Sequence, residues 1–215
     1  MDAVLDNLDL YVDGFVKTLQ LSVLGAVGAL VLGTLLAAMR VSPVPPLRAA
    51  GAVYVEIVRN TPLTVVFFFL VFGLPQIDIT LRFFTAAVWA LTLYTAAFVC
   101  EVVRSGVNSV AAGQAEAARA IGLTFPQTLR LIVLPQAFRT VVPPLGNVLI
   151  ALEKNSAIAA AFGVPELTAT GLRVAVGNPD AVVPVFLGVA VAYLVLTLPT
   201  GQLVGWLERK VAIVR

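Results

Sequence analysis

Ionisable side chains stand inside the most apolar stretches of this sequence. The polar residues Glu153-Lys154-Asn155-Ser156 follow thirteen uncharged residues that begin after Arg139, and Glu101 and Arg104 close another apolar run. An ionised group at the centre of a bilayer costs about 2.5–3.5 kcal/mol on insertion scales, so these groups should face a cavity or a partner. Thirteen residues are too few to cross a bilayer, so either the helix is broken at Glu153 or the cluster lies within the membrane.

The chemistry open to these groups is binding rather than catalysis. The sequence contains no His, which excludes an imidazole relay and a metal site built on His. Cys100 is the single cysteine and lies in an apolar run, so we expect it to pack rather than react. A nucleotide-binding loop of the form Gly-x4-Gly-Lys-Ser/Thr is also absent. We therefore expect no catalytic residue, metal or cofactor in this chain, and no ATPase activity of its own.

The elements that position these groups are membrane helices. Hydrophobic residues make up 60% of the 215 residues and charged residues only 12%, and the mean hydropathy is +0.98. Such a composition is typical of polytopic membrane proteins, in which a spanning helix takes about 20 residues. The sequence predicts an all-α membrane protein with a single domain over residues 1–215 and five transmembrane helices, near 15–39, 49–74, 83–104, 138–163 and 181–207.

Particular residues within and between these spans predict further structural features. Glu56 and Arg59, three residues apart, should pair on one face of the second span, and Thr61-Pro62 should kink it. The stretch from Pro165 to Asp180 should be a loop between the last two spans. The acidic start of the chain is unlike a signal peptide, so the first span should be retained. Close helix packing is expected at three glycines of that span, Gly25, Gly28 and Gly33.

The basic residues indicate the orientation of the chain. With five spans the two ends lie on opposite sides, and the positive-inside rule puts the side richer in Lys and Arg in the cytoplasm. Lys17, Arg82 and Arg173 lie on the poorer side. The sequence therefore predicts the N-terminus outside and the C-terminus in the cytoplasm, where these residues collect: Arg40, Arg48, Arg104, Arg119, Arg130, Arg139, Arg209, Lys210 and Arg215.

The segment from Gly113 to Pro135 is the one long polar-faced interlude between apolar runs. Good helix formers lead to Gly122, which is expected to end a short helix in the left-handed conformation. Thr124 and Gln127 then form a Thr-x-x-Gln capping box that opens a second helix, and Pro135 is expected to close it. A helix-turn-helix of this spacing also occurs in DNA-binding modules, but the apolar flanks make it a loop between membrane spans, with no nucleic-acid partner. A helix lying on the membrane surface is a further alternative.

The residues of this loop resemble a known family. Glu116-Ala117-Ala118, three residues, Gly122, nine residues and Ile132-Val133-Leu134-Pro135 resemble the EAA loop of the permease subunits of bacterial ABC importers. The resemblance extends from about Leu10 to Leu207. It is similar to the polar amino acid subfamily, the histidine, glutamine and glutamate permeases, in these stretches: Lys17-Thr18-Leu19, Arg59-Asn60-Thr61-Pro62-Leu63, Gly73-Leu74-Pro75, Glu101-Val102-Val103-Arg104, Pro135-Gln136-Ala137 and Pro144-Leu145-Gly146-Asn147.

The resemblance implies a type I ABC importer permease fold with a cytoplasmic coupling loop, here residues 105–135. The first short helix of that loop, the coupling helix, docks on an ATPase subunit in the family. Carried over, Glu116, Ala117 and Ala118 line the docking face, Gly122 makes the turn and Leu123 packs beside it. The alternative for Glu116 is an intrahelical pair with Arg119.

The resemblance also implies a substrate pathway. Family members commonly carry Lys-Asp-Thr-Ser where this chain has Lys154-Asn155-Ser156-Ala157, and an Asn-Tyr pair where it has Tyr94-Thr95. An amino acid needs a cation for its carboxylate, for which Lys154 is the candidate, and Glu101 could take the α-ammonium. Alternatively, Lys154 and Glu101 or Glu153 neutralise one another between helices. The pathway candidates are Lys154, Glu101, Asn155, Ser156, Tyr94 and Thr95.

The implied function is ATP-driven import of a polar amino acid, glutamate or glutamine, by alternating access across a bacterial cell membrane. The implied partners are an ABC ATPase dimer that holds ATP and Mg, a second permease, identical or paralogous, an extracytoplasmic solute-binding protein and the lipid bilayer. Two other functions stay open on the sequence. One is an ion-coupled carrier or channel that acts without an ATPase, and the other is a structural membrane subunit without a pathway.

Overall fold

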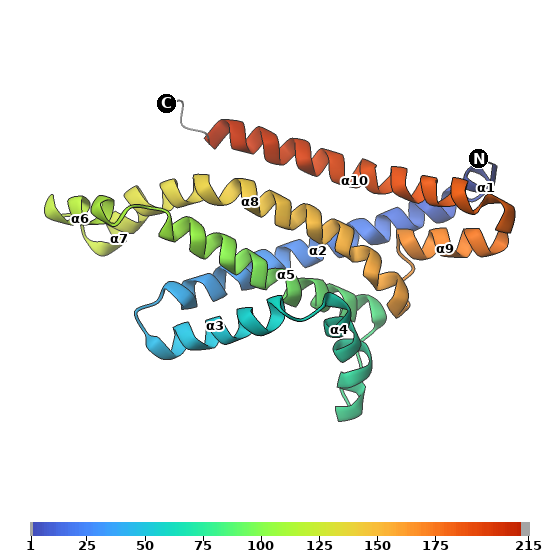
Figure 1. Cartoon of the computed structure of the whole chain (residues 1–215), viewed down its shortest axis with the longest axis horizontal. Helices are drawn as coiled ribbons and strands as arrows, with labels where there is room; N and C mark the ends of the chain where they lie inside the picture. Colours follow the sequence, from blue (N-terminus) through green and yellow to red (C-terminus); the bar gives the residue numbers. More distant parts are fainter. Residues whose placement is uncertain (1, 212–215) are drawn as a thin grey trace.

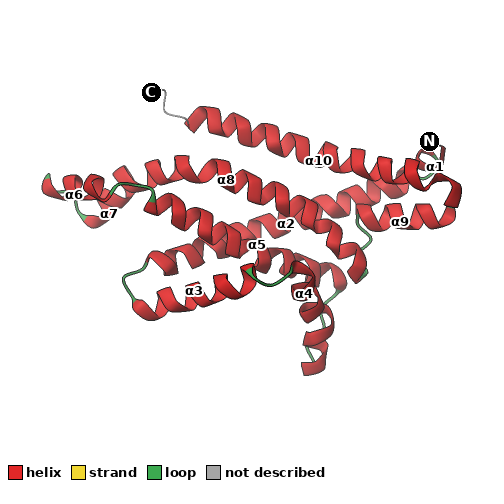
Figure 2. Cartoon of the chain, viewed as in Figure 1, coloured by secondary structure: helices red, strands yellow, loops and turns green. Residues whose placement is uncertain are grey.

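The computed structural model describes residues 2–211, and within that range the chain is helical and contains no strand (Figure 2). Three of its helices are long and apolar enough to cross a membrane, and two bent helix pairs bring the number of possible spans to five. The helices are α1 (Asp2–Leu5), α2 (Leu8–Val41), α3 (Pro45–Arg59), α4 (Leu63–Phe68), α5 (Phe83–Asn108), α6 (Ala112–Ala120), α7 (Phe125–Thr128), α8 (Leu134–Asn155), α9 (Leu167–Gly177) and α10 (Val182–Val211).

Helices α2 and α5 form the centre of the bundle (Figure 1). Two glycines of α2 let the backbones approach, as the sequence predicts. A Cβ on Gly28 would meet the Thr92 hydroxyl oxygen at 2.6 Å, and one on Gly33 would meet the carbonyl oxygen of Ala96 at 2.8 Å. Helix α8 packs along α5, and α10 packs along α8. The long helices lie along the longest axis of the molecule, so residues near opposite ends of a helix belong to opposite ends of the fold.

The second predicted span is not one straight helix. It consists of α3 and α4, extended by a π-helical turn at Phe69–Gly73 and a 3-10 turn at Leu74–Ile77. The axes of the two halves differ by 104°. The break falls at Thr61 and Pro62, where the sequence predicts a kink, because Pro62 has no amide hydrogen to continue the helix of α3.

Two expectations for the second half of the chain are wrong. Pro135 does not end a helix. The π-helical turn Leu129–Val133 joins α7 to α8, the amide of Leu134 bonds to the carbonyl of Leu129, and Pro135 then lies in the first turn of α8, where no amide hydrogen is needed. Nor is the stretch after Pro165 a loop, since it contains α9. The carboxylate of Glu166 caps that helix by accepting from the amide of Ala169 at 2.9 Å.

The ends of the molecule separate the basic residues as the sequence predicts. Helices α6 and α7, the α2–α3 connection and the C-terminal end of α10 lie toward one end, and α1 and α9 lie toward the other (Figure 1). Arg40, Arg119 and Lys210 belong to the first end, and Arg173 belongs to the second. Arg215 lies outside the described residues.

Candidate functional site

A cavity of about 290 Å3 lies between α5 and α8. It contains three of the residues expected along a substrate pathway: Tyr94 and Thr95 from α5, and Asn155 from the end of α8. Asn147, about one turn of α8 before Ala151, adds a second amide to the lining. Tyrosine, threonine and asparagine side chains offer both donors and acceptors, so this cavity can bind a small polar ligand.

The polar cluster at the end of α8 is divided between two faces of the helix. Lys154 is exposed, whereas Glu153 and Ser156 are buried. Glu153 accepts a 2.6 Å hydrogen bond from the Thr200 hydroxyl of α10, and the Ser156 hydroxyl donates to the Glu153 carbonyl at 2.6 Å. Ser156 is therefore used within the helix and does not line the cavity. Lys154 forms no ion pair with Glu153 or Glu101 within the described chain.

A second cavity, of about 330 Å3, follows along the same two helices. It is lined by Arg59, Glu101 and Arg104, together with Ser105 of α5 and Thr140 of α8. These polar groups lie nearer the α6–α7 end of the molecule than the first cavity does, because Glu101 follows Tyr94 along α5 and Thr140 precedes Asn147 along α8.

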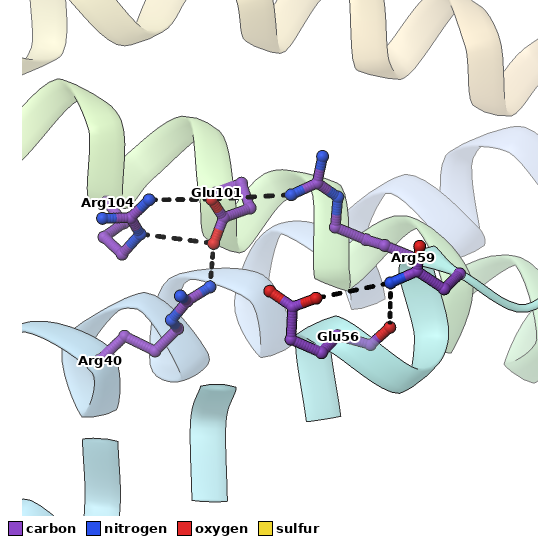
Figure 3. A network of polar contacts seen from close by, with 6 residues as sticks. Arg40, Glu56, Arg59, Glu101 and Arg104 are labelled. Atoms are coloured by element: carbon purple, nitrogen blue, oxygen red, sulfur yellow. Dashed lines mark hydrogen bonds and ion pairs between the residues drawn. The ribbon is translucent and has the colours of Figure 1, made fainter. Parts of the chain in front are cut away.

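Glu101 is surrounded by three guanidinium groups, from α2, α3 and α5 (Figure 3). Arg40 is paired with Oε1. Arg104 donates through both Nε and Nη2, at 3.3 and 2.9 Å, and Nη1 of Arg59 lies 3.6 Å from Oε2. The expectation that Glu101 takes an α-ammonium does not fit this arrangement, because both of its oxygens are already engaged by cations.

The expected pair of Glu56 with Arg59 is wrong for the same reason. Arg59 turns to Glu101, and the nearest polar partner of Glu56 is Asn60, whose side-chain amide donates to the Glu56 carbonyl at 2.7 Å and reaches its carboxylate at 3.4 Å. Their spacing places Glu56 and Arg59 on one helix face, but the half-buried Glu101 attracts Arg59 more strongly than an exposed carboxylate does. Sequence reasoning missed Arg40 and Arg59 as partners of Glu101, since they come from other helices.

Glu166 is a further carboxylate that sequence reasoning did not single out. It is fully buried and is held by neutral donors only: the Tyr193 hydroxyl of α10 at 2.8 Å, the Thr18 hydroxyl of α2 at 3.4 Å and the amide of Ala169. These bonds join α2, α9 and α10. The signal in the sequence was a Glu directly before the apolar helical run that begins at Leu167, which is the position of an N-cap residue.

The segment around Gly122 has the turn that the sequence predicts. Gly122 has φ +88°, in the left-handed region. The amide of Leu123 bonds to the Ala118 carbonyl at 3.1 Å and the amide of Gly122 to the Arg119 carbonyl at 3.0 Å, the two bonds of a Schellman motif. At the start of α7, the side chain of Gln127 accepts the Thr124 amide at 2.8 Å and the Thr124 hydroxyl at 2.9 Å. Local hydrogen bonds therefore fix the shape of this segment.

The residues expected to dock on a partner differ in exposure. Glu116 and Ala117 are exposed, Leu123 is half-buried, and Ala118 is only 4% exposed because it faces the inside of the segment. The alternative pair of Glu116 with Arg119 is not formed; Arg119 instead donates from Nε to the Ala115 carbonyl at 3.3 Å. Two large apolar side chains beside the turn are strongly exposed, Ile121 at 81% and Phe125 at 74%. Exposed apolar groups beside a free carboxylate suit a contact with another protein.

The sequence profile of the family described as "Binding-protein-dependent transport system inner membrane component" matches residues 29–213. A probable glutamine ABC transporter permease protein of Bacillus subtilis is 42% identical over 95% of this chain and 94% of its own length. A glutamate transport system permease protein of Corynebacterium efficiens is 45% identical over 93% and 92%. Among solved structures, one described as an amino acid ABC transporter with histidines has a TM-score of 0.89 and 31% identity, and covers 96% of both chains.

Proposed function

This chain belongs to the family of binding-protein-dependent transport system inner membrane components, and from that membership we propose that it is the permease subunit of an ATP-driven importer for a polar amino acid. The observation that carries this proposal is the extent of the similarity: relatives named as glutamine and glutamate permeases align with at least 93% of the chain. Glutamate or glutamine is accordingly the proposed substrate, and the chain is a membrane component rather than the ATPase.

The proposed assembly contains a second permease, an ATPase dimer that binds ATP and Mg, and an extracytoplasmic solute-binding protein. We place α6 and α7 in the cytoplasm and α1 and α9 outside, because the basic residues gather at the α6–α7 end. In this orientation the exposed Glu116, Ala117, Ile121 and Phe125 are presented to a cytoplasmic partner.

The proposed mechanism is alternating access driven by the ATPase. Closure of the nucleotide-bound ATPase dimer draws the α6 helices of the two permeases together and opens the outer side, and hydrolysis resets the assembly. ATP can shift this equilibrium only by its differential affinity for the two states, so the contact at α6 must transmit that difference. A rigid Schellman turn at Gly122 suits this role, because a flexible link would absorb the displacement.

We propose that the two cavities along α5 and α8, together called the α5/α8 groove, form the substrate route. Tyr94, Thr95 and Asn155 line its first cavity, and Lys154 lies one residue before Asn155 on the exposed face of α8. Contact between a charged ammonium group and lipid at this depth is energetically unfavourable. Lys154 should therefore face the second permease or a water-filled path, where it can bind a carboxylate.

Reconstitution tests the proposal. The chain should copurify with a soluble ATPase, and proteoliposomes that contain both should take up labelled glutamate or glutamine only with internal ATP. Addition of the binding protein should raise ATP hydrolysis. An ion-coupled carrier would instead move the amino acid down an imposed ion gradient without ATP, and that result would overturn the proposal.

A further inference from the structure

We propose that the second cavity of the α5/α8 groove is a carboxylate-binding site, in which Arg59 binds the side-chain carboxylate of an acidic amino acid as it crosses the permease. The inference rests on the proposed function and deepens it, since it selects glutamate over glutamine. Its starting point is the placement of Arg59, Glu101 and Arg104 around one cavity of about 330 Å3.

The charges around this cavity do not balance. Three guanidinium groups, those of Arg40, Arg59 and Arg104, contact the single carboxylate of Glu101. Glu56 is turned toward Asn60 and forms no ion pair within the described residues. Because Arg remains protonated in proteins, the contacting groups carry an excess of two positive charges between membrane helices. Such an excess of positive charge attracts an anion to the cavity.

The three arginines are not equally occupied by Glu101. Arg40 and Arg104 are 16% and 31% exposed, and each donates hydrogen bonds to the carboxylate. Arg59 is 42% exposed and lies 3.6 Å from Oε2, beyond an ordinary hydrogen bond. Its side chain makes no hydrogen bond with the described chain, although a guanidinium carries five N–H donors in a fork that matches a carboxylate. Arg59 is therefore the arginine that can bind a passing anion.

Arg59 also lies close to a residue of the first cavity. It lines the second cavity, and its guanidinium carbon is 5.5 Å from the ring centroid of Phe98, which lines the first. On the opposite wall, exposed α8 residues at spacings of four, three and four continue from one cavity to the other, Thr140, Pro144, Asn147 and Ala151. A ligand that leaves the first cavity along α8 comes within reach of Arg59.

The ligand chemistry follows from the two cations along this route. Lys154 directly precedes Asn155, which lines the first cavity, and Arg59 lines the second cavity. A dicarboxylic amino acid that follows this route can offer one carboxylate to each cation in turn. An amide side chain accepts a hydrogen bond but carries no charge, and charge-assisted hydrogen bonds are roughly twice as strong as neutral ones. Arg59 should therefore favour glutamate.

The test is binding of labelled L-glutamate and L-glutamine to the assembled importer without ATP, in nanodiscs of zwitterionic lipid. Arg59→Gln should weaken glutamate binding about tenfold or more, the loss expected for one charge-assisted bond, and glutamine binding by much less. Arg59→Lys should recover part of the affinity, because it keeps the charge but loses the fork. The matched control Arg82→Gln, at an exposed position outside the groove, should stay within about twofold of the wild type.

A measurement on the wild-type importer covers the case in which the Arg59 variants do not assemble. Phenylglyoxal modifies exposed guanidinium groups, and glutamate should protect Arg59 from it, but not Arg82, as read by mass spectrometry. If Arg59→Gln binds glutamate as well as the wild type does, or if glutamate does not protect Arg59, the proposed carboxylate-binding site is overturned. Protection by an acidic lipid in place of glutamate also overturns it and assigns the cavity to a headgroup. ATP-driven uptake by the wild type tests the proposed function separately, since uptake can occur even if Arg59 does not bind the carboxylate.

Discussion

The α6–α7 segment and the α5/α8 groove obtain their structures in opposite ways. The segment is held by hydrogen bonds between residues at most five positions apart, such as Leu123 with Ala118 and Thr124 with Gln127. In the groove, Arg40 and Glu101 come together across 61 residues of sequence. A region built by near neighbours keeps its shape when a partner pulls on it, whereas a region built by several helices changes when those helices move. The two properties suit force transmission and gating.

The two regions also differ in the kind of partner that each requires. The segment exposes apolar side chains, Ile121 and Phe125, at the end of the molecule that carries the basic residues. The groove holds more cations than carboxylates around Glu101, where α2, α3 and α5 meet. The first region is completed by a protein surface and the second by an anion. Single substitutions in each region can separate these two requirements.

Removal of the Glu101 charge should damage the groove most. Glu101→Gln leaves two half-buried guanidinium groups, and the exposed one of Arg59, without a counter-charge. Loss of one partner costs about 3–5 kcal/mol in a fully buried ion pair, and we expect a smaller cost at this half-buried site. We expect the thermal unfolding midpoint of the purified permease to fall markedly. The matched control is Glu56→Gln, an exposed carboxylate of the neighbouring α3 face, which should change stability by less than about 0.5 kcal/mol. Equal stability of the two variants would contradict the account of the groove.

Lys154→Met should remove a ligand contact from the groove without unfolding the protein, since Lys154 is exposed. A lost charge-assisted bond is worth about 1.5–3 kcal/mol, which corresponds to at least a tenfold rise in the substrate concentration for half-maximal uptake. Proteoliposome uptake over a range of concentrations measures this change. Full uptake by the variant would remove Lys154 from the pathway.

Gly122→Val should act on the segment alone. A β-branched residue in the left-handed conformation costs about 1–2 kcal/mol, and nothing within 4 Å of the added Cβ offsets this strain. We expect α6 to lose its fixed angle, so that ATP hydrolysis continues while uptake is lost and the membrane helices stay folded. Gly122→Asn, which tolerates the left-handed region, and Gly113→Ala, in open space, are the controls. Normal uptake by Gly122→Val would count against the coupling role.

Phe125→Ser should have the smallest effect. Because Phe125 is 74% exposed, its loss should leave the stability of the permease within about 0.5 kcal/mol of the wild type. The affinity for the ATPase subunit should fall about fivefold, the effect of a contact worth ~1 kcal/mol. Titration of the permease with purified ATPase measures it. An unchanged affinity would place Phe125 outside the interface.

The contrast between the regions also explains what the sequence could predict. The turn at Gly122, the Thr124–Gln127 contact and the kink at Pro62 were correctly predicted, because each follows from the backbone requirements of residues close in sequence. The close approach at Gly28 and Gly33 was also predictable, since small residues on a membrane helix have few other uses.

The predictions that were wrong concern features that depend on residues distant in sequence or on an uncommon helix geometry. The partner of Arg59 is set by the position of α5 against α3, and no spacing within α3 reveals it. Pro135 was expected to end a helix, but a π-helical turn precedes it and places Pro135 in the first turn of α8, where its missing amide hydrogen is tolerated. The helix after Glu166 was missed because its stability comes from Thr18 and Tyr193, on helices far away in sequence.

The most direct test of the central claim is photo-cross-linking from position 116 in the assembled importer. Glu116→Cys places a reactive thiol on the exposed face of α6, and the native Cys100 is buried and should not be labelled. With a benzophenone maleimide at this position, we predict an adduct with the ATPase subunit whose yield changes when ATP binds. An importer that forms no such adduct, or in which position 116 is labelled from outside the cell, would contradict the account.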